Sequence, residues 1–294
     1  MKLFSNIKIG LGILLLISIS CVQIHAASIN RSIKILAIGN SFSADAVESH
    51  LSDIANAAGV PMIIGNVAIA GGSLSMHLNN WEHNAGVYEY VKINSNGTVT
   101  KTTGRTIQSA VADEQWDYIS YQQVSSDAGQ YISIQASLPK LYDYVKANTT
   151  NKRVKHVLHQ TWAYDKNSTH TGFANYANDQ MKMYQAIVDA YSRAVKLRDF
   201  KVIVPAGTAI QNARTSTLGG SLTRDGYHLS LSLGRYIVAC TWFEQLTGKS
   251  IIRNSYMPKG LTSSQINIAR YAAHLAVKQP KKVTDMNSYA PNSN

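Results

Sequence analysis

The sequence predicts an α/β fold, a three-layer α/β/α sandwich around a central parallel sheet of about five strands. The alternation of two kinds of segment along the chain predicts this fold. Short apolar runs alternate along the chain with longer segments in which apolar residues recur every three or four positions. Strands that alternate with helices in this order favour parallel pairing, with helices covering both faces of the sheet.

Five apolar runs have the length and composition of strands, and each ends in glycine or polar residues. Strands are therefore expected within residues 32–40, 60–71, 116–124, 154–164 and 200–214, the last of which includes the loop after its strand. In such a fold, the functional site lies at the carboxyl ends of the strands.

Helical spacing of apolar residues appears between and after these runs. Helices are expected within residues 43–59, 106–115, 133–149, 172–197, 231–247 and 263–278. Gly59 closes the first of them, and Pro139 starts or interrupts the third. The polar tail begins at Gln279.

A hairpin insertion is expected near residues 88–104, because Asn96-Gly97 lies between alternating residues and favours a type I′ turn. Neither an internal repeat nor a linker-like segment is visible in the sequence. Residues 28–294 are therefore expected to form a single domain.

Residues 1–27 have the composition of a secretory signal peptide. Lysines precede an apolar core that ends in small residues, and cleavage is expected after Ala26 or Ala27. The mature protein is then periplasmic or extracellular, with no membrane span. An alternative makes Cys21 a lipid-anchored N-terminus, although Ser18 stands where a lipobox prefers leucine.

Composition limits the classes of partner. The net charge is +11, and removal of two signal-peptide lysines leaves +9, which suits anionic partners such as acidic glycans or is simply a solvated cationic surface. The basic residues are scattered without a nucleic-acid motif, so no nucleic-acid partner is expected. Cys240, the only cysteine after Cys21, is expected to be a buried apolar residue.

Three distant residues have the chemistry of a catalytic triad. Ser41 follows the first strand, and Asp225 and His228 lie three residues apart near the other end of the chain. Asp225 can orient one ring nitrogen of His228 while the other takes the proton of Ser41. The alternatives are that Ser41 only caps a helix and that Asp225-Gly226 only forms a surface turn.

The motifs "IGNSFS", "YQQVSS", "QTWAY" and "DGYHLS" resemble the SGNH/GDSL hydrolase superfamily, in a branch catalogued as a domain of unknown function. The resemblance spans about residues 33–248. It implies a flavodoxin-like sandwich and a serine hydrolase without a cofactor or metal. Ser41, Asp225 and His228 match the superfamily's nucleophile, acid and base.

The resemblance also implies an oxyanion hole. The backbone N–H of Ser41 and of a glycine in "AIAGGS" would contribute, and the glycine is Gly71 or Gly72. The superfamily's asparagine in the third block is absent. Gln122 or Gln123 stands in its place, and only one of them can face the site, with Gln122 the preferred candidate.

Aromatic residues after the fourth strand could bind substrate. Trp162 and Tyr164 are candidates for stacking on a sugar, with packing in the core as the alternative. His77 and His83 do not have a convincing metal-ligand spacing, so no metal site is expected.

Together these features predict an exported serine esterase that removes ester groups, such as O-acetyl groups, from carbohydrate. Two alternatives remain: a catalytically silent glycan-binding protein on the same fold, and an O-acyltransferase that uses the same triad. A lipid ester is a competing substrate, although the sequence shows no long apolar lid segment.

Overall fold

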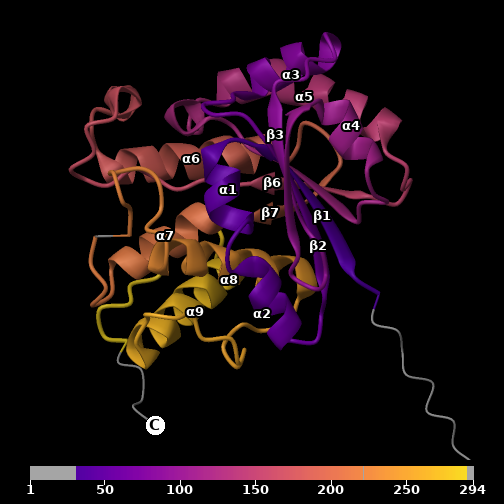
Figure 1. Cartoon of the computed structure of the whole chain (residues 1–294). Coiled ribbons are helices and arrows are strands. Elements are labelled where there is room, and N and C mark those ends of the chain that lie inside the picture. The colour runs from indigo at the N-terminus through magenta and orange to yellow at the C-terminus, as the bar shows by residue number, and fades with distance from the viewer. Residues whose placement is uncertain (1–30, 221, 290–294) are drawn as a thin grey trace, which may run out of the picture.

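The computed structural model describes residues 31–220 and 222–289. Figure 1 shows a central sheet between two layers of helices. The sheet has seven strands in the order β4-β3-β2-β1-β5-β6-β7. The strands are β1 (Ile33–Gly39), β2 (Met62–Ala68), β3 (Tyr88–Ile93), β4 (Val99–Arg105), β5 (Tyr118–Tyr121), β6 (Lys155–His159) and β7 (Phe200–Val204).

Five neighbouring strands, β2-β1-β5-β6-β7, are parallel. This order is the one found in flavodoxin-like sheets. The chain leaves β1 for β2 on one side and later returns to β5 on the other side of β1. The predicted fold class is confirmed, and a crevice is expected where the carboxyl ends of β1 and β5 diverge.

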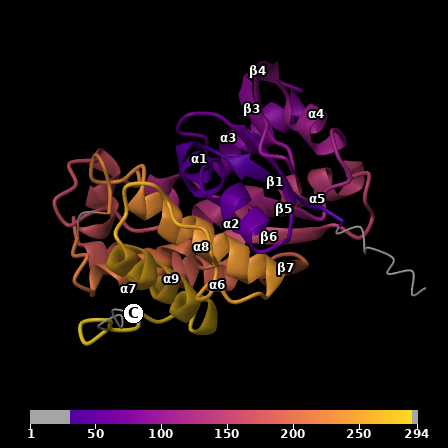
Figure 2. The same cartoon turned by 60° about the horizontal axis from the view of Figure 1, so that its bottom comes forward.

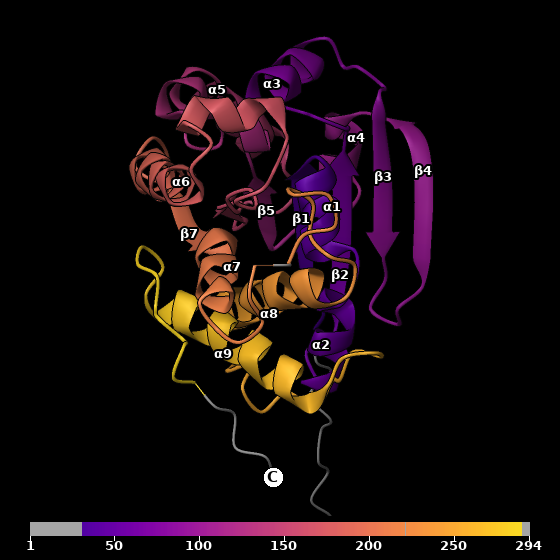
Figure 3. The same cartoon turned by 90° about the vertical axis from the view of Figure 1, so that its left-hand side faces the viewer.

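Helices cover both faces of the sheet (Figure 3). One layer contains α3 (Leu74–Glu82), α4 (Ile107–Ala112), α5 (Tyr131–Asn148) and α6 (Gln180–Ala194). The opposite layer contains α1 (Ser41–Val47), α2 (Leu51–Ala57), α7 (Ala206–Arg214), α8 (Leu233–Thr247) and α9 (Ser263–Lys278). Figure 2 shows α9 packed on the outside of α7 and α8.

The antiparallel strands β3 and β4 extend the sheet beside β2. Their connection closes with a bond from the Asn94 N–H to the Thr98 carbonyl oxygen, at 2.9 Å. The predicted type I′ turn is wrong. That turn needs positive φ at both central residues, and here Gly97 has a φ of 85° while Asn96 does not have a positive φ.

Several expected helix boundaries are also wrong. The segment 43–59 forms two helices instead of one, and 172–197 is divided at Ala177 and Asn178, both with positive φ, before α6 begins at the Asp179 cap. Pro139 lies inside α5 without interrupting it. Two helices, α3 and α7, were not expected.

The predicted signal peptide and Cys21 lie outside the described residues. Within residues 31–220 and 222–289, no helix combines the length and hydropathy needed to cross a bilayer. Cys240 is fully buried in α8, as expected.

Candidate active site

Ser41 is the first residue of α1, directly after the central strand β1. The N-cap of this helix is Asn40, whose Oδ1 accepts a hydrogen bond from the Phe42 N–H at 2.9 Å. The alternative in which Ser41 caps the helix is therefore wrong. Its hydroxyl is available for a partner from elsewhere in the chain.

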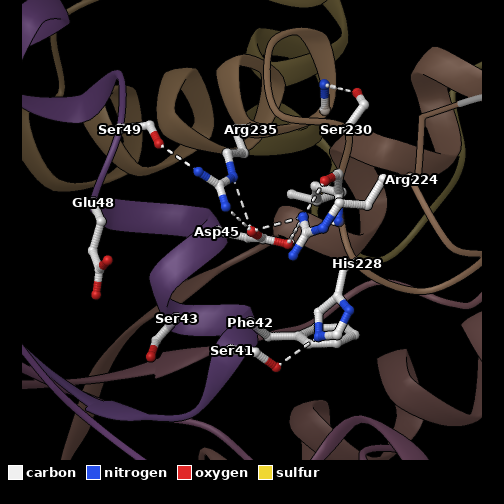
Figure 4. Close-up of polar contacts among 12 residues, drawn as sticks. Ser41, Phe42, Ser43, Asp45, Glu48, Ser49, Arg224, His228, Ser230 and Arg235 are labelled. Atoms are coloured by element: carbon white, nitrogen blue, oxygen red, sulfur yellow. Dashed lines mark hydrogen bonds and ion pairs between the residues drawn. The ribbon is translucent and has the colours of Figure 1, made fainter. Parts of the chain in front are cut away.

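That partner is His228. Its Nε2 lies 2.9 Å from the Oγ of Ser41, and its Nδ1 lies 2.6 Å from Oδ2 of Asp225 (Figure 4 shows the first contact). An ionised carboxylate can only accept, so the proton of the neutral imidazole is assigned to Nδ1. Nε2 is then the acceptor for the Ser41 O–H, which is the arrangement a general base requires.

The turn that carries Asp225 and His228 is closed by its own hydrogen bonds. Oδ1 of Asp225 accepts from the N–H groups of Tyr227 and His228, at 3.1 and 2.7 Å. Gly226, the residue after Asp225, has a φ of 90°, and a Cβ there would approach Ser168 to about 3.0 Å. This backbone therefore requires glycine, and it places the acid and the base on one side of the turn.

The environment of Asp225 favours its charged form. Partial burial raises the pKa of the carboxyl, but the hydrogen bonds from the His228 ring and from two backbone N–H groups outweigh it. The net effect is a lowered pKa. Asp225 is thus ionised at neutral pH and can stabilise an imidazolium ion at His228.

Asn40 links three parts of the site although its side chain is buried. Besides capping α1, its Oδ1 accepts from Nε2 of Gln122 at 2.6 Å. Its Nδ2 donates to the carbonyl oxygen of Gly72 at 2.9 Å. One amide therefore fixes the segments after β1, β2 and β5 relative to one another.

Gln122 and Gln123 point to different parts of the molecule. Gln122 lies beside Asn40, and its Oε1 accepts from Nδ1 of His159, 3.1 Å away. Burial lowers the pKa of His159 to about 3, so this ring is neutral. Gln123 instead accepts from the Leu74 N–H and donates to Ser133, which joins the first turns of α3 and α5.

The two glycines of the turn after β2 also differ. The N–H of Gly72 donates to the carbonyl oxygen of Ile69 at 3.0 Å. Gly71 is exposed, with a φ of 64°, and no described atom accepts from its N–H. Of the two candidates, Gly71 is the one with a free donor.

Trp162 and Tyr164 do not lie on the rim of the site. Both rings are fully buried, so the prediction that they stack on a sugar is wrong in this conformation. Trp162 stacks on Phe42 with ring centroids 4.3 Å apart, and its Nε1 donates to the Tyr227 carbonyl oxygen at 2.7 Å. It therefore supports the two segments that carry Ser41 and His228.

A buried ionic cluster beside the triad was not predicted. Asp45, one helical turn after Ser41, contacts Arg224 and Arg235 (Figure 4). A signal was present in the sequence, because a four-residue spacing places residues 41 and 45 on the same face of a helix.

A depression at the surface lies beside Asp225, and its lining does not include Ser41 or His228. Its volume is about 300 Å³. It is lined by Asp165, Asn167, Thr169, Thr223, Arg224, Asp225 and Gly226, and all of these except Gly226 have polar side chains. Such a lining offers both hydrogen-bond donors and acceptors to a ligand.

Comparison with known proteins adds three findings. A family model described as "Domain of unknown function (DUF4886)" matches residues 34–276. A solved DUF4886 family protein from Bacteroides uniformis is 50% identical, with 87% of this chain and 98% of that chain covered and a TM-score of 0.86. No curated protein is similar in sequence to this chain.

More distant solved structures are also similar. The acetylxylan esterase Axe2 from Geobacillus stearothermophilus is 14% identical, with 74% of this chain and 96% of that chain covered and a TM-score of 0.50. A putative SGNH hydrolase from Slackia heliotrinireducens is 20% identical, with 74% and 100% covered and a TM-score of 0.46.

Proposed function

This chain belongs to the DUF4886 family, and on that premise we propose that it is a serine esterase of the SGNH/GDSL hydrolase type. The observation that carries the proposal is the chain of contacts Ser41–His228–Asp225, at 2.9 and 2.6 Å. A nucleophile, a base and an orienting carboxylate in this order are the parts that acyl transfer needs.

The reaction proceeds in two halves. Ser41 Oγ attacks the ester carbonyl while its proton passes to Nε2 of His228, and the imidazolium then protonates the departing alcohol. A water molecule next gives its proton to His228 and attacks the acyl-enzyme. The carboxylic acid leaves as the proton returns to Ser41. Asp225 stays ionised throughout and holds the ring.

The tetrahedral oxyanion needs donors that are not already used. Within the described residues, the backbone N–H groups of Ser41 and Gly71 donate no hydrogen bond. Gln122 is the proposed third donor. Its amide nitrogen carries two hydrogens, one of which is donated to Asn40. Loss of one such donor typically lowers kcat by about 10²–10³-fold.

The proposed substrate is an ester of a carbohydrate, such as an O-acetylated glycan, and the protein is proposed to act after export. The polar depression beside Asp225 supports a hydroxyl-rich leaving group. The buried Trp162 and Tyr164 no longer support it. Transfer of the acyl group to a sugar acceptor would use the same residues and differ only in whether water reaches the acyl-enzyme.

A fluorophosphonate probe tests the proposal, because it phosphonylates only an activated serine. We expect labelling of the wild type, and loss of labelling in Ser41→Ala and His228→Ala. Both variants should lose about 10⁶-fold in kcat for acetate release from acetylated polysaccharides. Ser264→Ala, an exposed position in α9, is the matched control and should label normally.

The alternative is a glycan-binding protein without catalytic activity. It is favoured by the glutamine, Gln122 or Gln123, that stands where the superfamily has an asparagine in its third block. It predicts a folded wild-type protein that binds glycans but does not react with the probe. Unlabelled wild type, or labelling that persists in Ser41→Ala, would contradict the esterase.

A further inference from the structure

A buried carboxylate lies beside the proposed triad but takes no part in the chemistry described above. Asp45 belongs to α1 and is 1% exposed. Nη1 of Arg224 lies 3.0 Å from each of its oxygens, and Nε of Arg235 lies 2.8 Å from Oδ1. The N–H of Leu229 donates to Oδ2 at 2.8 Å. Figure 4 shows Arg224 and Arg235 converging on the carboxylate.

An ionised carboxylate this deeply buried is costly unless it is fully paired. Here the pairing is supplied from two other segments. Arg224 and Leu229 belong to the loop that carries His228, and Arg235 belongs to α8. Replacing the cluster with apolar side chains would avoid the desolvation cost, so its presence favours a role in fixing geometry.

The cluster connects α1, which carries Ser41, to the loop that carries His228. It does so close to the contact between Ser41 and His228 in both segments. Ser41 contacts His228, and Asp45, one turn further along α1, contacts Leu229, the residue after His228. In the described part of the chain, every other hydrogen bond between α1 and residues 222–230 goes to Asp45.

Arg224 strengthens this connection from within the loop. Besides Asp45, its Nη1 contacts the carbonyl oxygen of Leu229, and its own N–H donates to the His228 carbonyl oxygen at 2.9 Å. The guanidinium of Arg235 differs, since its other partner is the Ser49 hydroxyl and it bonds no atom of the loop. The two guanidinium groups thus pair with the same carboxylate, but only that of Arg224 also bonds the backbone of the loop.

We propose that Asp45 is a positioning residue that sets the distance between His228 Nε2 and Ser41 Oγ by clamping the His228 loop onto α1. This inference rests on the proposed esterase function. Asp45 does not touch the substrate. Its loss therefore weakens proton transfer from Ser41 without changing how the substrate binds.

The test is Asp45→Asn, which keeps the side-chain shape but removes the charge. We expect kcat and kcat/KM to fall by the same factor, about 10²-fold, because a misplacement of about 1 Å between reacting groups has this effect. KM should not change, and the rate of fluorophosphonate labelling should fall in parallel. All rates are expressed per folded molecule.

Variants of the two arginines should lose kcat to different extents. Arg224→Gln should lower kcat nearly as much as Asp45→Asn, and Arg235→Gln clearly less, because only the Arg224 side chain bonds the loop backbone. Arg224 is about one-third exposed, so its variant remains informative if Asp45→Asn does not fold. Equal kcat losses in the two arginine variants would contradict the clamp.

Glu244→Gln is the matched control. Glu244 is another buried carboxylate, in α8, and it accepts from His274 at 2.6 Å and from the Ile251 N–H at 2.9 Å. This variant should lose stability but keep its kcat.

The outcomes separate the two proposals. Wild-type kcat in Asp45→Asn, or an equal loss of kcat in Glu244→Gln, would overturn the positioning role while leaving the esterase intact. A wild-type protein that neither labels nor hydrolyses esters would overturn the esterase, and the positioning role with it.

Discussion

Ser41 and His228 lie within hydrogen-bonding distance, 2.9 Å, although 187 positions of sequence separate them. The serine is fixed by the end of the central strand β1. The histidine is fixed by a turn that Asp225 closes from within and that Trp162 supports through Tyr227. The contact therefore depends on several independent supports, and each can be removed separately.

Asp225→Asn tests the orienting carboxylate. The amide oxygen can still accept from the Tyr227 and His228 N–H groups, so the turn should keep its shape. The amide nitrogen would donate to Nδ1 and force the imidazole proton onto Nε2, where it cannot accept from Ser41. We expect kcat to fall by about 10⁴-fold, measured on a soluble ester at neutral pH.

The matched control for that variant is Asp285→Asn. Asp285 is exposed and accepts the N–H of the residue two positions later, Asn287, at 2.9 Å, as Asp225 does with Tyr227, but it does not line the depression beside Asp225. Its kcat should stay near that of the wild type. If Asp225→Asn were as active as Asp285→Asn, Asp225 would not be the residue that orients His228.

Asn40→Asp keeps the shape of the side chain but replaces its amide nitrogen with oxygen, and we expect it to harm the protein. The bond from Nδ2 to the Gly72 carbonyl oxygen would become two oxygens facing each other in a buried site. The loss of free energy of unfolding should be about 1–3 kcal/mol. The kcat should fall as well, because the turn that carries Gly71 loses its connection to α1.

Urea unfolding and ester hydrolysis measure both effects. Asn151→Asp is the control, because Nδ2 of Asn151 also donates to a backbone carbonyl, that of Trp116, at 2.8 Å and outside the site. It should lose stability but keep its kcat. An Asn40→Asp variant that is as stable and active as the wild type would show that the Asn40–Gly72 bond is unimportant.

The sequence predicted the features that depend on local composition. Short apolar runs located the five parallel strands, and the residue types at positions 41, 225 and 228 indicated the chemistry. It did not predict α7, because residues 205–214 were expected to be the loop after the fifth strand, although Ala206, Ala209, Ile210 and Ala213 have helical spacing. Burial depends on tertiary packing, so the positions of Trp162 and Tyr164 could not be read from their residue types.

The contacts of Asp45 and Asn40 illustrate the same limit. Each side chain binds partners that are far away in the sequence, and nothing in the local pattern identifies those partners. The choice between Gly71 and Gly72 likewise required the hydrogen bond from Gly72 to Ile69.

The turn after β2 provides a third prediction. A Cβ on Gly72 would lie 2.7 Å from Cε1 of His77 and 2.7 Å from Cγ2 of Ile69, so Gly72→Ala must displace the turn. Its kcat should fall towards the 10²–10³-fold loss expected for a missing oxyanion donor. Gly71→Ala meets no atom and keeps its N–H, so it should cost about 1–2 kcal/mol of stability for its positive φ and little kcat. Steady-state kinetics of both variants measure the two losses of kcat. A larger loss in Gly71→Ala than in Gly72→Ala would contradict this prediction.

His77 links the fold to pH. Burial lowers its pKa to about 4, so the folded protein keeps this ring neutral while the unfolded chain protonates it near its ordinary pKa of about 6.5. Between these values the unfolded state binds more protons, and stability therefore falls as the pH falls. His77→Gln removes this contribution. From pH 6 to pH 5, the free energy of unfolding of the variant should therefore fall by about 1 kcal/mol less than that of the wild type.

Urea titrations at the two pH values measure the difference. The comparison cancels any uniform loss of stability in the variant, and the other buried histidines, His156 and His159, act equally in both proteins. Identical pH dependence in the two proteins would mean that His77 is not held neutral by its burial.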